Sequence, residues 1–255
     1  MKPPAPLQRY LGMERLKALL VLAASATFVA SPLFVTNFAG YDPALFPVPQ
    51  IDPPVQPAGW AFSIWGLIYA WLIVSAVYGL LARAMDPAWD RPRWPLFGAL
   101  ALGTFWLYTA TLSPIWATVL IFVMLILALG AAARAPSHDS WLLGAPLGLF
   151  AGWLTAASFA SLGITAAGFG LWMGQTAWAF ACITGALVVG LTALLTLRPH
   201  PTYALALAWA LAAIAIKDWG THTDVALFAA LGALATLAAM LRSYYLRATP
   251  ANPAQ

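Results

Sequence analysis

The sequence predicts an all-α membrane protein, a polytopic transmembrane bundle of about eight helices. Only 8% of the 255 residues are charged and 62% are hydrophobic, with a mean hydropathy of +0.82. A soluble domain covers its surface with roughly 25% charged residues, so this chain lacks the composition of one. Apolar segments of the roughly 20 residues that a bilayer requires recur along the whole chain.

Eight apolar segments are expected to form the helices. In chain order they cover residues 16–38, 58–82, 95–112, 114–133, 141–162, 172–197, 202–216 and 223–242. The first could be taken for a secretory signal, because Lys17 precedes an Ala-rich run and the Ala30-Ser31 bond looks cleavable. Its apolar run continues beyond that bond, so we expect a retained helix.

The basic residues predict how these helices are oriented. Eleven of the twelve Lys and Arg residues lie in the two terminal tails or in the loops after the second, fourth and sixth segments. Only Lys217 lies on the other side. Cytoplasmic loops of membrane proteins are enriched in Lys and Arg, so both termini are expected in the cytoplasm, in a bacterial cytoplasmic membrane. This placement explains the net charge of +4 without a nucleic-acid partner.

Two loops on the opposite side are distinctive. Residues 39–57 hold six prolines, which favour a stiff, extended chain that either covers a cavity or acts as a spacer. The stretch KDWGTHT, from Lys217 to Thr223, places a cation beside Asp218. It is expected to be a solvated turn with a local ion pair of little energetic weight.

The predicted spans lack ionisable residues near their centres. Ion-coupled transporters and proton pumps usually carry such residues at the bilayer midplane, so these classes are disfavoured. The three histidines (His138, His200 and His222) are isolated in loops, and the single cysteine, Cys182, lies in an apolar run. No metal site and no catalytic residue is therefore expected, and the chain is not expected to be an enzyme.

Aromatic residues supply the main candidate for a binding site. The chain has thirteen tryptophans, and several of them fall deep within the predicted spans. Along the second segment Phe62, Trp65 and Tyr69 are spaced i, i+3, i+7, so they share one helix face. This face either packs against neighbouring helices or lines a cavity for a flat apolar ligand.

Small residues recur every fourth position along the fifth segment. The repeat comprises Gly144, Gly148, Gly152, Ala156 and Ala160. Such a stripe allows another backbone to approach closely and predicts a helix-packing face. The partner is either another helix of the same chain or a second copy in a homodimer.

Three stretches resemble signatures of the TspO/MBR family of tryptophan-rich sensory or translocator proteins, and specifically its longer branch. PAGWAFSIWGLIY, from Pro57 to Tyr69, is similar to the family pattern at the start of the second helix. LGTFW resembles the third-helix pattern, with Gly103 where the family has Asn. GWLTAASFAS resembles the fifth-helix pattern, with Ser161 where Asn is common.

The resemblance implies a five-helix unit with a ligand cavity beneath the first loop. It divides the chain into a cytoplasmic tail (1–15), a TspO-like five-helix membrane unit (16–165), a three-helix extension (166–242) and a second cytoplasmic tail (243–255). The positions that match the family's ligand-binding residues are Trp60, Phe62, Trp65, Tyr69, Trp106 and Trp153.

The resemblance also implies a function. Family members bind tetrapyrroles such as protoporphyrin and haem, and some bind sterols, so a porphyrin or another flat apolar molecule is the expected ligand. The expected role is that of a membrane sensor or regulator. The alternatives are a carrier for a lipophilic or uncharged solute and, as debated for the family, an enzyme that degrades porphyrin.

Overall fold

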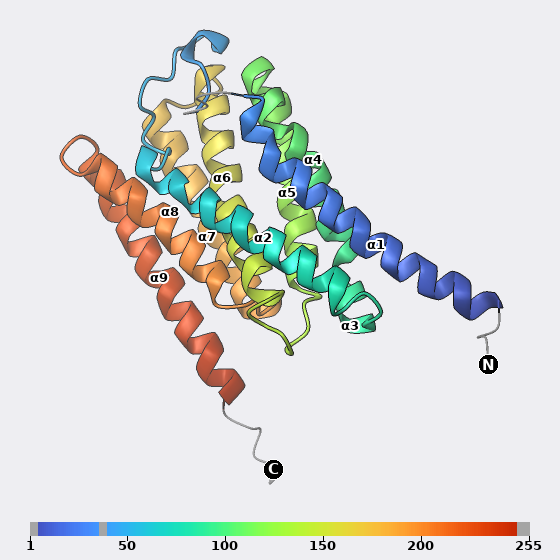
Figure 1. Cartoon of the computed structure of the whole chain (residues 1–255). Coiled ribbons are helices and arrows are strands. Elements are labelled where there is room, and N and C mark those ends of the chain that lie inside the picture. The colour runs from blue at the N-terminus through green and yellow to red at the C-terminus, as the bar shows by residue number, and fades with distance from the viewer. Residues whose placement is uncertain (1–4, 36–39, 249–255) are drawn as a thin grey trace.

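The computed structural model describes residues 5–35 and 40–248, and within them every regular element is helical. Eight long helices and the four-residue α3 (Pro87–Asp90) make up the fold. The long helices are α1 (Ala5–Ala30), α2 (Ile64–Leu81), α4 (Arg93–Leu112), α5 (Pro114–Ala132), α6 (Gly144–Gly168), α7 (Gln175–Thr196), α8 (Thr202–Asp218) and α9 (Thr223–Ala248). Each of the eight predicted segments overlaps one of them, which confirms the predicted fold class (Figure 1).

Seven helices are long and apolar enough to cross a membrane, and α8, with 17 residues, is not among them. The largest difference from the predicted boundaries occurs at α1, and α6 also differs at its end. α1 begins at Ala5, before the predicted start at residue 16. Residues 5–15, although partly polar, are largely good helix formers such as Leu, Gln, Arg and Glu. α6 continues to Gly168, six residues beyond the predicted end of that segment.

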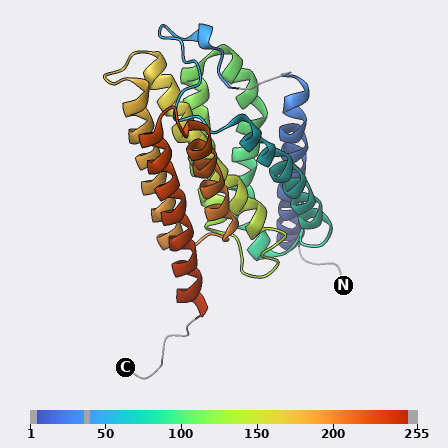
Figure 2. The same cartoon turned by 90° about the vertical axis from the view of Figure 1, so that its left-hand side faces the viewer.

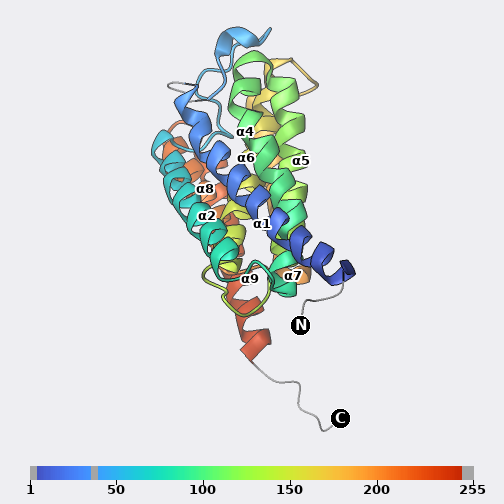
Figure 3. The same ribbon diagram turned by 45° about the vertical axis from the view of Figure 1, so that its right-hand side comes forward.

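α6 is the central helix of the bundle. Of its most apolar stretch, 83% is buried inside the protein, far more than in any other candidate span. α5, α7 and α8 pack directly against it, and α2 crosses it more loosely (Figure 3). A helix rich in Gly, Ala, Ser and Thr can accept several neighbours because its narrow surface lets their backbones approach.

The bundle has two distinct ends (Figures 1 and 2). The first turn of α1 and the last turn of α9 lie at one end, termed here the termini end. The proline-rich loop, residues 40–57, and the α8–α9 turn lie at the other, termed the loop end. Prolines interrupt helix formation in the first segment, and a turn at Gly220, which has a positive φ of 91°, does so in the second.

The three C-terminal helices are packed closely onto the first five. α7 and α8 both contact α6, and α9 covers α7 and α8 from outside. The boundary suggested after residue 165 falls in the last turn of α6, and the division into two units stays a prediction.

Candidate functional site

A cavity of about 380 Å³ lies in the half of the bundle nearer the loop end. Side chains of α1, α2, α4, α5 and α6 line it, and most of this lining is apolar. Trp65 and Tyr69 come from α2, and Phe62 comes from the 3-10 turn Gly59–Ser63 that leads into it; all three line the cavity, as their spacing predicted. Trp106 of α4 and Trp153 of α6 complete the aromatic lining predicted from the sequence.

The aromatic rings form a packed wall rather than a loose group. Trp65 and Tyr69 are stacked, with centroids 5.3 Å apart and planes at 25°. Trp153 meets Phe62 and Trp65 edge to face, at centroid distances of 5.6 and 6.2 Å. These geometries favour the rings energetically and hold them in place, so a flat ligand would meet a preformed surface.

Trp60, the sixth predicted binding residue, lies outside this cavity. Its ring packs edge to face against Trp209 of α8, with centroids 5.0 Å apart, and 47% of the side chain is exposed. Trp60 lies five residues before Trp65, a spacing that places two helical side chains on different faces, so Trp60 points away from the face of Trp65 and Tyr69.

Phe28 of α1 is a cavity residue that the sequence did not reveal. Its ring lies edge-on to both Trp65 and Tyr69, at 5.7 and 5.1 Å between centroids. Phe28 occupies space beside Gly103, where a Cβ atom would lie 2.7 Å from its Cε2 atom. The signal in the sequence that could have pointed to Phe28 was Gly103 itself. The TspO/MBR pattern has Asn at this position, and the glycine leaves room for an aromatic ring.

A smaller chamber of about 60 Å³ continues the cavity toward the loop end. Phe62, Trp106 and Trp153 line both chambers, so the two share a wall. The outer chamber adds Tyr41 and Gln56 from the proline-rich loop and Ser161 from α6. These three side chains border the outer chamber, although the surface that the chamber exposes is almost entirely apolar.

Four hydroxyl groups form a hydrogen-bonded chain beside the outer chamber. The Tyr41 hydroxyl lies 2.5 Å from Ser161 Oγ, which lies 2.7 Å from Thr118 Oγ1 on α5. Thr118 Oγ1 lies 2.9 Å from Thr165 Oγ1 on α6. Burial raises the pKa of Tyr41, so its hydroxyl remains protonated and neutral at ordinary pH.

The proline-rich loop covers the outer chamber and is fixed by several contacts. Val48 N donates to the carbonyl of Gly168 at 2.9 Å. The buried Phe46 ring packs between Tyr41 and Phe169 and lies over Gly168, which has no side chain to obstruct it. Of the two roles considered from the sequence, the loop therefore takes the position of a cover over a cavity.

Lys217 fastens this loop to the C-terminal helices. Its Nζ donates to the carbonyl of Pro53 at 2.7 Å and to Asp52 Oδ1 at 3.2 Å. The expectation of a solvated turn was wrong for this residue, because its side chain is only 13% exposed and Asp218 beside it is 2% exposed. The loop reaches the end of α8 at Lys217, which also lies 3.5 Å from Asp218 Oδ1, the local ion pair expected from the sequence.

α8 also supports the start of α2. Trp209 Nε1 donates to the carbonyl of Ala61 at 3.0 Å, immediately before the cavity residue Phe62. Together with the Trp60 to Trp209 ring contact, this bond fixes the turn from which the aromatic face of α2 begins.

The stripe of small residues on α6 faces α8 of the same chain. A Cβ atom at Gly148 or Gly152 would collide with Thr202 or with the backbone of Tyr203. Two interhelical hydrogen bonds accompany this approach, from Thr202 Oγ1 to the Ala145 carbonyl at 2.7 Å and between Thr155 Oγ1 and the Tyr203 hydroxyl at 2.8 Å. Further along, Ala160 lines the outer chamber.

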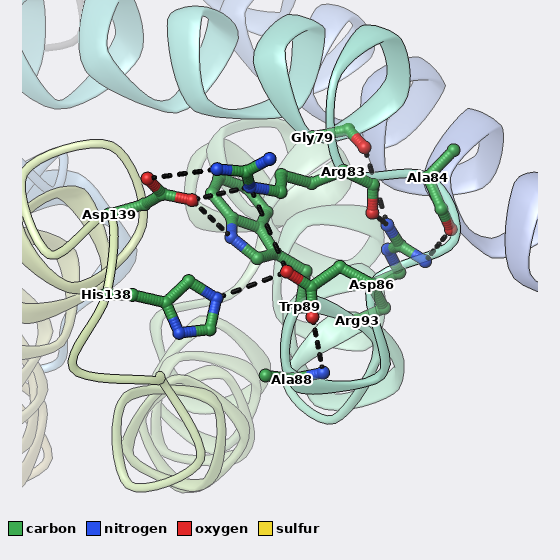
Figure 4. Close-up of polar contacts among 9 residues, drawn as sticks. All are labelled: Gly79, Arg83, Ala84, Asp86, Ala88, Trp89, Arg93, His138 and Asp139. Carbon is green, nitrogen blue, oxygen red and sulfur yellow. Dashed lines mark hydrogen bonds and ion pairs between the residues drawn. The ribbon is translucent and has the colours of Figure 1, made fainter.

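At the termini end a polar cluster joins the α2–α4 connection to the α5–α6 loop (Figure 4). Arg83 Nε donates to Asp139 Oδ2 at 2.7 Å, and Trp89 Nε1 donates to the same oxygen at 3.2 Å. The buried Arg93 donates to the carbonyls of Ala84 and Arg83 at 2.8 and 2.7 Å. Among the described residues no group of three or more His, Cys, Asp or Glu is placed to hold a metal ion.

The fold and its long apolar helices define an integral, multi-pass α-helical membrane protein. Residues 19–242 match the model of the family described as TSPO-like protein. The match includes all eight long helices in whole or part, and the chain belongs to this TSPO-like family, as the resemblance indicated. Comparison with curated proteins and with solved structures gives no match.

Proposed function

We propose that the chain binds a flat, apolar small molecule in the aromatic cavity and acts as a membrane sensor or regulator. The observation that supports this function is the cavity of about 380 Å³ walled by Trp65, Tyr69, Trp106 and Trp153. Small-molecule sites are typically concave, apolar and of about 300 to 1,000 Å³, with few polar groups. Aromatic walls suit a flat ligand because rings stack or meet edge to face with favourable energy.

The packing between the cavity and the termini end favours sensing over transport. Toward the termini end the space between the helices is filled by Leu72 of α2, Leu100 of α4 and Leu147 of α6, each at most 2% exposed. The cavity is thus a chamber with a closed floor, as a receptor requires. A carrier would need this floor to open, and counterflow of a labelled ligand in liposomes would detect that opening.

Energy transfer from tryptophan to pyrene tests the binding function. Pyrene is flat and lacks polar groups, and we expect it to quench the fluorescence of the purified protein in lipid nanodiscs in a saturable manner. Trp65→Ala should weaken this binding about fivefold or more, because one stacked ring pair contributes roughly 0.5–1.5 kcal/mol beyond its buried area.

Trp116→Ala is the matched control. Trp116 is 67% exposed near the start of α5 and lines neither chamber, so its removal should lower the fluorescence without changing the dissociation constant. If wild-type quenching does not saturate, or if both variants weaken it equally, the proposed function is wrong.

We further propose that the termini end faces the cytoplasm. Arg15 and Lys17 lie in the first half of α1 and Arg134 lies just after α5, on the side of the termini end and of the cluster in Figure 4, whereas Lys217 lies at the loop end. The enrichment of Lys and Arg in cytoplasmic segments supports this orientation.

A further inference from the structure

The α8–α9 turn contains two buried polar atoms that have no hydrogen-bonding partner among the described residues. They are Oδ2 of Asp218, whose side chain is 2% exposed, and Nδ1 of His222. The other carboxylate oxygen, Asp218 Oδ1, lies 3.7 Å from His222 Nδ1. A buried carboxylate oxygen without a donor is costly, and a hydrogen shared between the imidazole and the carboxylate would remove that cost.

The backbone of the turn holds the imidazole beside the carboxylate. The amides of Thr221 and His222 both donate to the carbonyl of Asp218, at 3.1 and 2.9 Å. Gly220, with its positive φ of 91°, allows the chain to reverse within these few residues. The two side chains are therefore kept close by the turn itself and not only by their mutual attraction.

The same carboxylate is linked to the proline-rich loop through Lys217. Lys217 Nζ lies 3.5 Å from Asp218 Oδ1, and it donates to Asp52 Oδ1 at 3.2 Å and to the Pro53 carbonyl at 2.7 Å. Asp52 and Pro53 belong to the loop, whereas Asp218 belongs to α8. Asp218 therefore competes with the loop for the charge of Lys217.

The charges on the helix side of this contact determine how strongly it attracts Asp52. With a neutral imidazole, the charges of Lys217 and Asp218 cancel, whereas a proton on Asp218 or His222 leaves the helix side with a positive charge beside Asp52. Asp224, in the first turn of α9, is exposed and contributes the same charge in both states. α6 and α7, which pack against α8 and α9, carry no charged residue along their length.

Two properties favour uptake of a proton by this pair under mildly acidic conditions. Histidine is the side chain that ordinarily changes its charge between about pH 5 and 8. Burial raises the pKa of Asp218, and the opposing charge of Lys217 cancels this effect only in part. A proton that binds more tightly while the loop is in place stabilises that state as the pH falls.

We propose that Asp218 and His222 together form a proton-binding site that tightens the proline-rich loop under mildly acidic conditions. The bound proton supplies the missing hydrogen bond between the imidazole and the carboxylate, and it leaves Lys217 to Asp52 and the Pro53 carbonyl. The loop that covers the outer chamber is then held more firmly as the pH falls. The inference concerns the protein without a ligand, so it does not depend on the proposed binding function.

Hydrogen exchange followed by mass spectrometry tests the proposal on ligand-free protein in nanodiscs. The reporter is the Val48 amide, which donates to the Gly168 carbonyl and is protected while the loop is in place. Protection factors, corrected for the chemical effect of pH on exchange, are compared at about pH 7.5 and about pH 5.5, across the range in which histidine changes its charge. Acidification should raise the protection of the Val48 peptide about 2- to 5-fold, the effect of one partly exposed ion pair.

Substitutions at the pair should abolish this response in opposite ways. His222→Gln removes the imidazole, so protection should stay at the lower value at both pH values. Asp218→Asn keeps the size of the side chain without its charge, so protection should stay at the higher value. Asp52→Asn should also abolish the response, and its 75% exposed side chain makes misfolding no concern.

His138→Gln is the matched control. His138 also lies beside a carboxylate, 3.1 Å from Asp86 Oδ2, but at the termini end, so this variant should respond to pH as the wild type does. Equal protection at the two pH values in the wild type would refute the proton-binding site. A full response in His222→Gln, or the loss of the response in His138→Gln, would refute it as well. A failure of pyrene to bind would leave this result unchanged, because the loop is measured without a ligand.

Discussion

Gly103 illustrates how a single missing side chain shapes the cavity. The Phe28 ring lies where a Cβ atom of residue 103 would be, and this ring in turn closes the inner chamber against Trp65 and Tyr69. Met124 of α5 is also close, with its Cε atom 3.1 Å from the same position. Two neighbouring helices therefore depend on the absence of a side chain on α4.

Gly103→Ala is expected to destabilise the protein and to weaken pyrene binding. The added methyl group would force Phe28 to move, and overpacking of this kind typically costs about 1 to 3 kcal/mol. Thermal unfolding in detergent, followed by tryptophan fluorescence, would show a lower Tm.

Gly66→Ala serves as the control for this substitution. Gly66 lies on α2 with nothing within 4 Å of a built Cβ atom, so alanine there should leave the Tm unchanged or raise it slightly through its better helix propensity. Equal Tm values for the two variants would show that Phe28 adjusts without cost.

At the scale of elements, the C-terminal helices act on the cavity without lining it. Among the described side chains, none of α7, α8 or α9 lines either chamber, yet α8 holds the Ala61 carbonyl through Trp209 and the proline-rich loop through Lys217. α8 packs directly against α6, where Gly152 contacts the backbone of Tyr203. Its position relative to α2 and to the loop is therefore set by a close helix contact.

Lys217→Met should loosen the proline-rich loop and accelerate ligand exchange. The substitution keeps most of the side-chain volume but removes the bonds to Pro53 and Asp52. In stopped-flow measurements we expect a severalfold faster dissociation of pyrene with a smaller change in the Tm. Arg242→Met, which removes an exposed cation from α9, should leave the dissociation rate unchanged. A rate equal to that of the wild type in Lys217→Met would show that the loop is held by its other contacts alone.

The contact between Arg83 and Asp139 should make the termini end sensitive to acid (Figure 4). The hydrogen bond from Arg83 holds the pKa of Asp139 below its usual value. A carboxyl group whose pKa is lower in the folded state contributes stability above its unfolded pKa, near 4, and loses it as the pH falls through the folded value. The Tm should therefore fall below about pH 4.

Asp139→Asn separates this contact from the neighbouring groups. It removes one titrating carboxyl group and leaves Asp86 and His138, which lie 3.1 Å apart, in place. The variant should have a lower Tm at pH 7 and a smaller further loss on acidification. An acid response identical to that of the wild type would assign the effect to other carboxyl groups.

For the whole molecule, the even number of long helices brings both ends of the chain to the same end of the bundle (Figures 1 and 2). The single cysteine, Cys182, is buried at 2% exposure and can be replaced to give a background for labelling. In a Cys182→Ser background, Thr221→Cys reports on the loop end and Ser137→Cys on the termini end.

A membrane-impermeant maleimide should label Thr221→Cys in intact cells and Ser137→Cys only after the cells are permeabilised. The physical reason is the excess of Lys and Arg at the termini end, which favours its retention in the cytoplasm. The reverse pattern would place the loop end in the cytoplasm and refute the proposed orientation.

Much of the fold followed from local features of the sequence. Runs of apolar residues identified all eight long helices, because the low dielectric of a bilayer requires backbone hydrogen bonds to be satisfied within each span. The spacing of Phe62, Trp65 and Tyr69 placed these residues on one face, and all three line the inner chamber together with Trp106 and Trp153. Periodicity within one helix is a local property, so it can be recognised in the sequence without knowledge of the tertiary structure.

Only the tertiary structure decided which helices meet and what each side chain faces. Phe28, distant in sequence from the signature segments, closes the cavity because Gly103 makes room for it. Trp60 belongs to a 3-10 turn and packs against Trp209 outside the cavity. By itself the sequence determined a helical membrane protein with an aromatic face on α2. The aromatic cavity formed by five helices and its support by α8 arise from contacts between distant segments, which local spacing does not encode.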